Sequence, residues 1–205
     1  MSGVGVIVAG AVGYLLGSFP SADLATRLAT RGTVDLRTAG SGNPGATNAA
    51  QVLGTRWGVA VLIVDMVKGV AAGFVGLALG DGAGGYFAAT MSIAGHIFPP
   101  WSRFRGGKGV ATSAGACLAV FPAYFPIDLA VAAIGAMAAK QAERATQISG
   151  AVWVGGALLW WVADLPNAWG PEPTGGLVAF AGVSTIMILG KFAHARRAAP
   201  RKAAE

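Results

Sequence analysis

The chain has 205 residues, of which 54% are hydrophobic and only 12% are charged, and its mean hydropathy is +0.59. Because a soluble domain usually carries about 25% charged residues, this composition argues against a soluble enzyme and indicates a small integral membrane protein. One cysteine and two histidines also argue against a disulfide framework and a structural zinc site.

Seven apolar segments follow one another along the chain and predict an all-α bundle of seven membrane-spanning helices. A helix needs about 20 apolar residues to cross a bilayer, with about 17 near the lower limit. The fifth segment is short, and Pro122 and Pro126 interrupt the pattern just before it, so the fourth and fifth could form one broken helix. A six-span alternative therefore stays open. The segments are residues 3–19, 58–79, 84–101, 109–126, 127–139, 147–163 and 175–191.

The basic residues predict the orientation of these spans. With the N-terminus outside and seven crossings, every Lys and Arg except Lys68 falls in an inner loop or in the C-terminal tail. Positive residues accumulate on the cytoplasmic side of a membrane. A six-span chain would place either the basic tail or the first basic loop outside, which favours seven spans. The charged residues of the outer loops, Asp81, Asp164 and Glu172, are all acidic.

We therefore expect a multi-pass plasma-membrane protein with its C-terminus in the cytoplasm. Residues 1–192 are predicted to form one polytopic domain, and residues 193–205 a basic cytoplasmic tail. No Lys or Arg precedes the first apolar run, so a cleaved signal peptide is not expected. The net charge of +6 is accounted for by this topology and by attraction to anionic lipid, so no nucleic-acid partner is needed.

The first predicted inner loop contains AGSGNPGATN, from Ala39 to Asn48. Its glycines match the G-x-G-x-x-G dinucleotide pattern, but no hydrophobic strand precedes them and a membrane span follows, so a dinucleotide site is excluded. Ser41, Asn43, Thr47 and Asn48 place hydroxyls and amides beside flexible backbone. The alternative is an ordinary turn that caps the second span, because Gly, Asn, Pro and Ser dominate turns.

The second predicted inner loop, Arg103–Thr112, reads RFRGGKGVAT. Three cations accompany glycines whose backbone can approach a ligand closely, and successive N–H groups before a helix form a concave anion site. Ser102 stands where the first glycine of a Walker A motif should be, so an ATP site is excluded. Two such loops on one membrane face favour a shared anion site.

Three ionisable residues lie within or at the end of predicted spans. Asp65 and Lys68 are three residues apart, so they share a helical face and can neutralise each other as a structural pair. His96 lies at the inner end of the third span. It is either a structural hydrogen-bonding group or a functional one, because intramembrane ionisable groups are functional candidates by default.

Together these residues resemble the bacterial acyl-phosphate:glycerol-3-phosphate acyltransferase family of integral membrane enzymes, PlsY. The resemblance runs in order over more than half of the chain and implies a seven-span helical bundle with its N-terminus outside. The matching pieces are GSFPSA (17–22), DLRTAGSGNPGATN (35–48), VDMVKG (64–69) and GHIFPPWSRFRGGKGVAT (95–112).

The resemblance implies transfer of a fatty acyl group from acyl phosphate to the 1-hydroxyl of glycerol 3-phosphate. The product is lysophosphatidic acid, the first intermediate of phospholipid synthesis, so the expected partners are these two substrates and membrane lipid. Because acyl phosphate is already activated, no cofactor, metal or covalent nucleophile is required. The resemblance assigns importance for activity to Ser41, and binding of the glycerol 3-phosphate phosphate to Gly106, Gly107, Lys108 and Gly109.

The full set of candidate residues combines the two loops with the ends of two spans. The candidate catalytic residues are Ser41, Asn43, Asn48, His96 and Lys108. The candidate substrate-binding residues are Arg37, Gly42, Thr47, Arg105, Gly106, Gly107, Gly109, Thr112 and His194.

Two motifs depart from the family pattern. Gln51 stands where the family usually carries an arginine, and Lys191 and His194 stand near the expected histidine and asparagine of the C-terminal motif. Arg37, Arg56 or Lys191 could supply the missing positive charge. The alternative is a divergent paralogue that acylates another acceptor, or a non-catalytic phosphate- or lipid-binding membrane protein.

Overall fold

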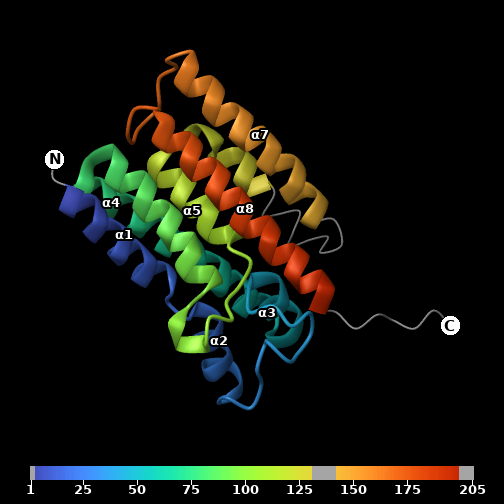
Figure 1. Ribbon diagram of the computed structural model, residues 1–205. Coiled ribbons are helices and arrows are strands. Elements are labelled where there is room, and N and C mark those ends of the chain that lie inside the picture. The colour runs from blue at the N-terminus through green and yellow to red at the C-terminus, as the bar shows by residue number, and fades with distance from the viewer. Residues whose placement is uncertain (1–2, 131–141, 199–205) are drawn as a thin grey trace.

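The computed structural model describes residues 3–130 and 142–198, and every regular element in these ranges is a helix (Figure 1). The all-α class predicted from the apolar segments is confirmed for these residues. The α-helices are α1 (Gly3–Gly17), α2 (Ser21–Thr30), α3 (Ala46–Leu53), α4 (Thr55–Ile97), α5 (Val110–Val120), α7 (Ala142–Val162) and α8 (Gly175–Ala198). Two 3₁₀ turns, η1 (Pro100–Ser102) and η2 (Pro122–Tyr124), separate them.

The long helix α4 consists of two arms joined by a kink. Gly80 and Asp81 leave helical geometry, and Asp81 adopts a φ of 53°. The chain reverses there, because Gly76 on the first arm packs against the Gly84 backbone and the Ala88 methyl group on the second. The predicted second and third segments therefore form a helical hairpin.

Three helical stretches in the described part of the chain are long and apolar enough to cross a membrane: Gly3–Thr30, Thr55–Ser102 and Gly175–Arg196. The predicted fourth segment is not continuous, since α5 ends at Val120 and η2 begins at Pro122. Proline lacks the N–H that would continue the helix, as its position in the sequence suggested. The predicted fifth segment, 127–139, lies largely outside the described residues.

Small residues allow the helices to approach closely. A Cβ at Gly13 of α1 would overlap the Ala88 backbone, and a Cβ at Gly69 of α4 would overlap the Thr112 carbonyl at the start of α5. The second arm of α4 is thus packed on α1 and the first arm on α5. This close packing is what small residues provide where no hydrophobic effect drives helices together within lipid.

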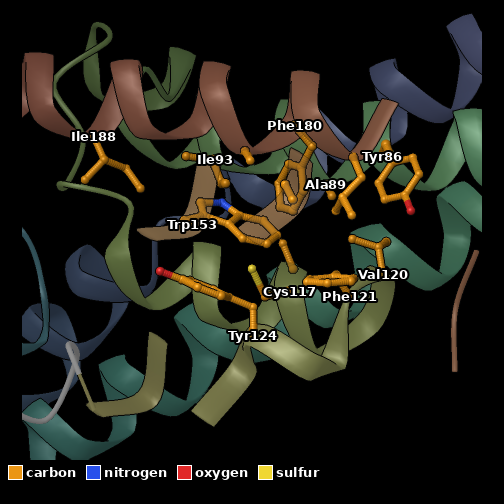
Figure 2. Close-up of a cluster of buried hydrophobic side chains, with 14 of the residues drawn as sticks. Tyr86, Ala89, Ile93, Cys117, Val120, Phe121, Tyr124, Trp153, Phe180 and Ile188 are labelled. Atoms are coloured by element: carbon orange, nitrogen blue, oxygen red, sulfur yellow. The ribbon is translucent and has the colours of Figure 1, made fainter. Parts of the chain in front are cut away.

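An aromatic cluster packs α5, α7 and α8 against each other (Figure 2). The Trp153 ring stacks on Tyr124 with a centroid separation of 4.4 Å and meets the edge of Phe180 at 5.7 Å. Phe121 lies 5.5 Å from Trp153. Such pairs contribute about 0.5–1.5 kcal/mol each beyond the burial of area.

The first polar loop differs from its prediction. The turn at 39–45 leads into the separate helix α3, and Gly54, with a φ of 99°, divides α3 from α4. The alternative in which this turn directly caps the second span is therefore wrong, because α3 lies between them. Helix α8 also continues past residue 192 to Ala198, so the first part of the predicted tail is helical, and residues 199–205 lie outside the described chain.

The polar segments gather at one end of the bundle. Figure 1 shows α2, α3, the loop after α4 and the C-terminal end of α8 at the same end, opposite the start of α1. The helices therefore present the two motif-bearing loops on one face.

Candidate functional site

The first motif loop is held in shape by the Asn48 side chain. Asn48 is buried, and its Nδ2 donates hydrogen bonds of 2.9 Å to the Leu36 and Ala39 carbonyls. Its Oδ1 accepts a 2.8 Å hydrogen bond from the Ser41 backbone N–H. Gly40 adopts a φ of 60°, a left-handed conformation that favours glycine. The structure thus engages the Asn48 amide with loop backbone and presents Ser41 as an exposed residue.

The other candidates in this loop lie close to Ser41 along the chain. Asn43 is half-buried, with its Nδ2 beside Gly45, while Gly42 is exposed with a φ of 72°. Thr47 is half-buried in the first turn of α3. Gln51, one turn further along α3, is exposed.

Arg37 joins the two motif loops. Its Nε donates a 2.9 Å hydrogen bond to the Arg105 carbonyl, 68 residues away, and its guanidinium forms a bidentate pair with Asp23 at 2.6 and 3.1 Å. Asp35 lies at 3.5 Å from the same guanidinium. Partial burial lowers the pKa of Arg37, but the hydrogen bond and charge of Asp23 outweigh this and raise it. Arg37 therefore stays charged while it anchors the second loop to α2.

The glycine loop packs directly on the end of α4. The Gly106 N–H donates a 3.1 Å hydrogen bond to the Ile97 carbonyl. At Gly107 an added Cβ would overlap His96 Nε2 and approach the Pro44 carbonyl to 2.9 Å. Gly107 thus brings the two loops and the imidazole into contact, which the sequence predicted only as a shared face.

A buried cluster of charged and polar side chains includes His96 and adjoins this contact. Asp65 Oδ1 accepts hydrogen bonds from Ser21 Oγ at 2.5 Å and from Lys68 Nζ at 2.8 Å, and His96 Nδ1 lies 3.5 Å from it. Lys68 also donates to the Phe19 carbonyl at 3.3 Å. All four side chains are buried. The Asp65–Lys68 pair predicted from their spacing is confirmed.

Sequence reasoning missed the Ser21 and His96 contacts with Asp65. Helical spacing identifies neighbours three or four residues apart, but Ser21 is 44 residues from Asp65 and lies on α2. The one signal in the sequence was that Ser21, Asp65 and His96 all occur in the motifs shared with the acyltransferase family.

Two cavities adjoin the loops. A narrow one of about 20 Å³, room for about one water molecule, is lined by Ser21, Arg37, Pro44, Lys68, His96 and Gly107 among others. A wider cleft of about 360 Å³ opens beside it, and Asp23 and Arg37 line both. Arg37 and Asp23 are therefore shared by the narrow cavity and the wider, arginine-rich cleft.

Lys108 lies on the side of the loop that faces α8. Its Nζ is 4.0 Å from the Phe192 ring centre, and burial lowers the pKa of Lys108 despite the attraction of Glu143 on α7. Lys191 Nζ lies 6.0 Å from the Phe98 ring centre and experiences the like charges of Arg105 and Arg37. Lys191 thus adds to the positive charge around Arg105 and Arg37, while His194 is exposed.

The start of α5 completes the second loop. Gly109, with a φ of 90°, precedes the helix, and its carbonyl accepts a 2.8 Å hydrogen bond from the Ser113 N–H. Thr112 in the first turn is fully buried, and its Oγ1 has no hydrogen-bond partner among the described residues.

The family model described as "Glycerol-3-phosphate acyltransferase" matches residues 7–199. The chain belongs to the glycerol-3-phosphate acyltransferase family. Among curated relatives with that name, one from Nitrobacter winogradskyi is 48% identical over 129 residues, covering 62% of this chain and 63% of the relative. One from Rhodopseudomonas palustris is 37% identical over 161 residues, covering 77% and 79%. The first match thus spans less than two thirds of the relative's length.

Solved structures share the fold of this family member. The crystal structure of PlsY, described as an integral membrane glycerol 3-phosphate acyltransferase in its glycerol 3-phosphate form, matches with a TM-score of 0.71 and 28% identity. The match covers 94% of this chain and 90% of that one. A lysophosphatidic acid form matches with a TM-score of 0.68 and 25% identity. The family resemblance predicted from the motifs is confirmed.

Proposed function

We propose that the protein is a membrane acyltransferase that transfers a fatty acyl group from acyl phosphate to the 1-hydroxyl of glycerol 3-phosphate. Family membership supports the reaction class. The observation that carries the proposal to this chain is the junction of the two motif loops, where Arg37 binds the Arg105 carbonyl and Gly107 packs on His96. Cationic and glycine-rich segments that meet in this way suit two phosphate-bearing substrates.

The reaction depends on positioning the two substrates, because the acyl phosphate is already activated. The acceptor hydroxyl oxygen forms a bond to the acyl carbonyl carbon, the carbonyl–phosphate bond breaks, and phosphate leaves. A substrate phosphate accepts the hydroxyl proton in this scheme. Holding both substrates in attack geometry supplies about 7–11 kcal/mol, and N–H donors directed at the developing oxyanion lower the barrier further.

The residues take distinct roles in this proposal. Ser41 contacts the reacting groups, and Asn48 positions it through the loop backbone. The glycine loop and Lys108 bind the acceptor phosphate, while Asp65, Lys68 and His96 support that loop from below. Lys191 supplies positive charge in place of the arginine that Gln51 replaces, because it lies near Arg105 and Arg37.

The enzyme assay tests the reaction directly. Purified protein in detergent is given labelled glycerol 3-phosphate and palmitoyl phosphate, and lysophosphatidic acid is measured. Lys108→Ala should abolish turnover, while Arg144→Ala, which removes an exposed cation on α7, should retain it. Normal kinetics in Lys108→Ala would remove the glycine loop from the site, and no product from the wild type would reject glycerol 3-phosphate as the acceptor.

Gln51→Arg tests whether the chain is a divergent paralogue. Because Lys191 supplies this charge in the proposal, Gln51→Arg should leave KM for glycerol 3-phosphate nearly unchanged. If the charge were missing, the restored arginine would lower KM by about tenfold or more, since a charge-assisted hydrogen bond contributes about 1.5–3 kcal/mol. If the wild type is inactive and Gln51→Arg produces lysophosphatidic acid, the chain is a divergent paralogue. An unchanged KM would show that Lys191 already fulfils the role.

We also propose seven spans, an outer N-terminus and a site open to the cytoplasm, on the basis of the charge distribution. Single cysteines in a C117S background test this orientation with a membrane-impermeant maleimide. A cysteine in place of Glu172 should react in intact cells, and one in place of Thr33 only after permeabilisation. Both native side chains are exposed, so labelling reports the side of the membrane.

A further inference from the structure

The 360 Å³ cleft beside Arg37 has an excess of positive charge, and two of its arginines, Arg27 and Arg103, have no role in the proposed reaction. Its lining includes the four arginines Arg27, Arg37, Arg103 and Arg105 and the two acids Asp23 and Asp35. Both acids pair with Arg37. Among the described residues, no acidic side chain forms an ion pair with Arg27, Arg103 or Arg105. The positive charge of these three arginines is therefore not neutralised by a neighbouring acid in the described part of the chain, and the cleft suits an anion.

Exposed apolar side chains lie on the same two segments as the arginines that line the cleft. On α2, Leu24 is 44% exposed and Leu28 is 65% exposed, on either side of Arg27. Trp101, which lines the cleft, is 63% exposed, and Phe104 is 59% exposed. An amphipathic helix with arginine beside exposed leucines is typical of a segment that lies in the membrane interface. A free, fully hydrated anion would not require this apolar surface.

The loop between η1 and the glycine motif also has an unusual backbone conformation. Arg103 and Phe104 both adopt left-handed conformations, with φ of 53° and 61°. Two consecutive non-glycine residues in this region carry strain that clusters at ligand-binding sites. Trp101 Nε1 donates a 2.9 Å hydrogen bond to Ser18 Oγ at the end of α1, which places the cleft at the end of an apolar helix.

We propose that this cleft binds the headgroup of an anionic phospholipid of the surrounding bilayer. The headgroup phosphate pairs with Arg27 and Arg103, and the acyl chains lie along the exposed side chains of α2 and of the 101–104 loop. Arginine suits this role because its planar guanidinium binds phosphate oxygens in a bidentate manner. The bound lipid occupies a site next to the acceptor site, on the far side of the Arg37–Asp23 pair.

Native mass spectrometry tests the proposal independently of turnover. The wild-type protein, purified from mixed micelles with equal phosphatidylglycerol and phosphatidylcholine, should retain one phosphatidylglycerol per chain and no phosphatidylcholine. Arg27→Gln combined with Arg103→Gln should lose this lipid. Both side chains are exposed, so the fold should persist, and Tm in phosphatidylcholine alone should match the wild type.

Three controls distinguish a specific lipid site from general charge attraction and from the acceptor site. Arg31→Gln combined with Arg144→Gln removes the same charge from exposed positions outside the cleft and should retain the lipid. Loss of phosphatidylglycerol in this control would show general attraction and overturn the proposal, as would equal retention by the cleft variant. Leu28→Ser should weaken retention without any change of charge. Displacement of the lipid by glycerol 3-phosphate would identify the cleft as the acceptor's own site and also overturn it.

Discussion

The Arg37 side chain donates a hydrogen bond from Nε to the Arg105 carbonyl at 2.9 Å, and so connects two loops that are 68 residues apart in the chain. The same guanidinium is held by Asp23 on α2. One side chain thus fixes the relative position of both motif loops, which makes it a sensitive point for mutation.

Arg37→Lys should lower kcat/KM for glycerol 3-phosphate by about tenfold. The lysine keeps the charge but cannot form the bidentate pair with Asp23 and the bond to Arg105 together. Each charge-assisted hydrogen bond contributes about 1.5–3 kcal/mol, and the 30% exposure of Asp23 reduces the effect. Asp23→Asn should give a loss in the same direction, measured in the same steady-state assay. Wild-type kinetics in both variants would contradict a bridging role for Arg37.

Gly107→Ala should abolish activity and lower Tm. The added methyl group would overlap the His96 imidazole and crowd the Pro44 carbonyl, so the loop would have to move away from α4. Overpacking of this kind costs about 1–3 kcal/mol. Gly155→Ala on α7 is the matched control, because a Cβ there meets nothing within 4 Å. Equal turnover in the two variants would show that the contact between the loops is dispensable.

Asp65→Asn should destabilise the protein strongly. Removing one partner of a buried ion pair leaves an uncompensated charge, at a cost of about 3–5 kcal/mol. Lys68 would keep its bond to the Phe19 carbonyl, but a neutral amide at residue 65 could not balance its charge. The double variant Asp65→Asn with Lys68→Met removes that uncompensated charge and should recover part of the lost Tm, measured by tryptophan fluorescence in detergent. A double variant less stable than Asp65→Asn alone would refute a charge-based origin of the loss.

The pH dependence of kcat/KM should report Lys108. Burial lowers its pKa, and the charged form binds phosphate, so kcat/KM for glycerol 3-phosphate should be full at lower pH and fall as pH rises through this lowered pKa. The fall should begin at a lower pH than for an ordinary lysine. Lys108→Arg keeps its charge and should flatten the profile over the same range, whereas an identical fall would assign it to another group.

The contribution of Lys108 to stability should change with pH in the direction opposite to kcat/KM. Because its folded pKa is lowered, the folded protein binds fewer protons than the unfolded chain between the two pKa values. Stability from this group therefore rises with pH while kcat/KM falls. Tm and kinetics measured on the same samples separate the two effects.

Several features could be predicted from the sequence because they depend on local properties. The length and polarity of an apolar run determine whether it can be a membrane helix. Proline at residue 122 ends α5 whatever surrounds it, because its ring removes a backbone donor. The spacing of Asp65 and Lys68 likewise places them on one helical face without reference to the rest of the chain.

The partners of these residues depend on the tertiary structure. Asn48, predicted to act in catalysis, directs its amide to the backbone around Ser41, and Asp65 meets Ser21 and His96 from other elements. These contacts depend on how closely the helices approach at glycines such as Gly13 and Gly69. The sequence alone therefore establishes the helical membrane class, the family and the two loops expected to bind anions. Packing sets which side chains meet, because hydrogen-bond partners distant in sequence are brought together by helix contacts and leave no local periodicity.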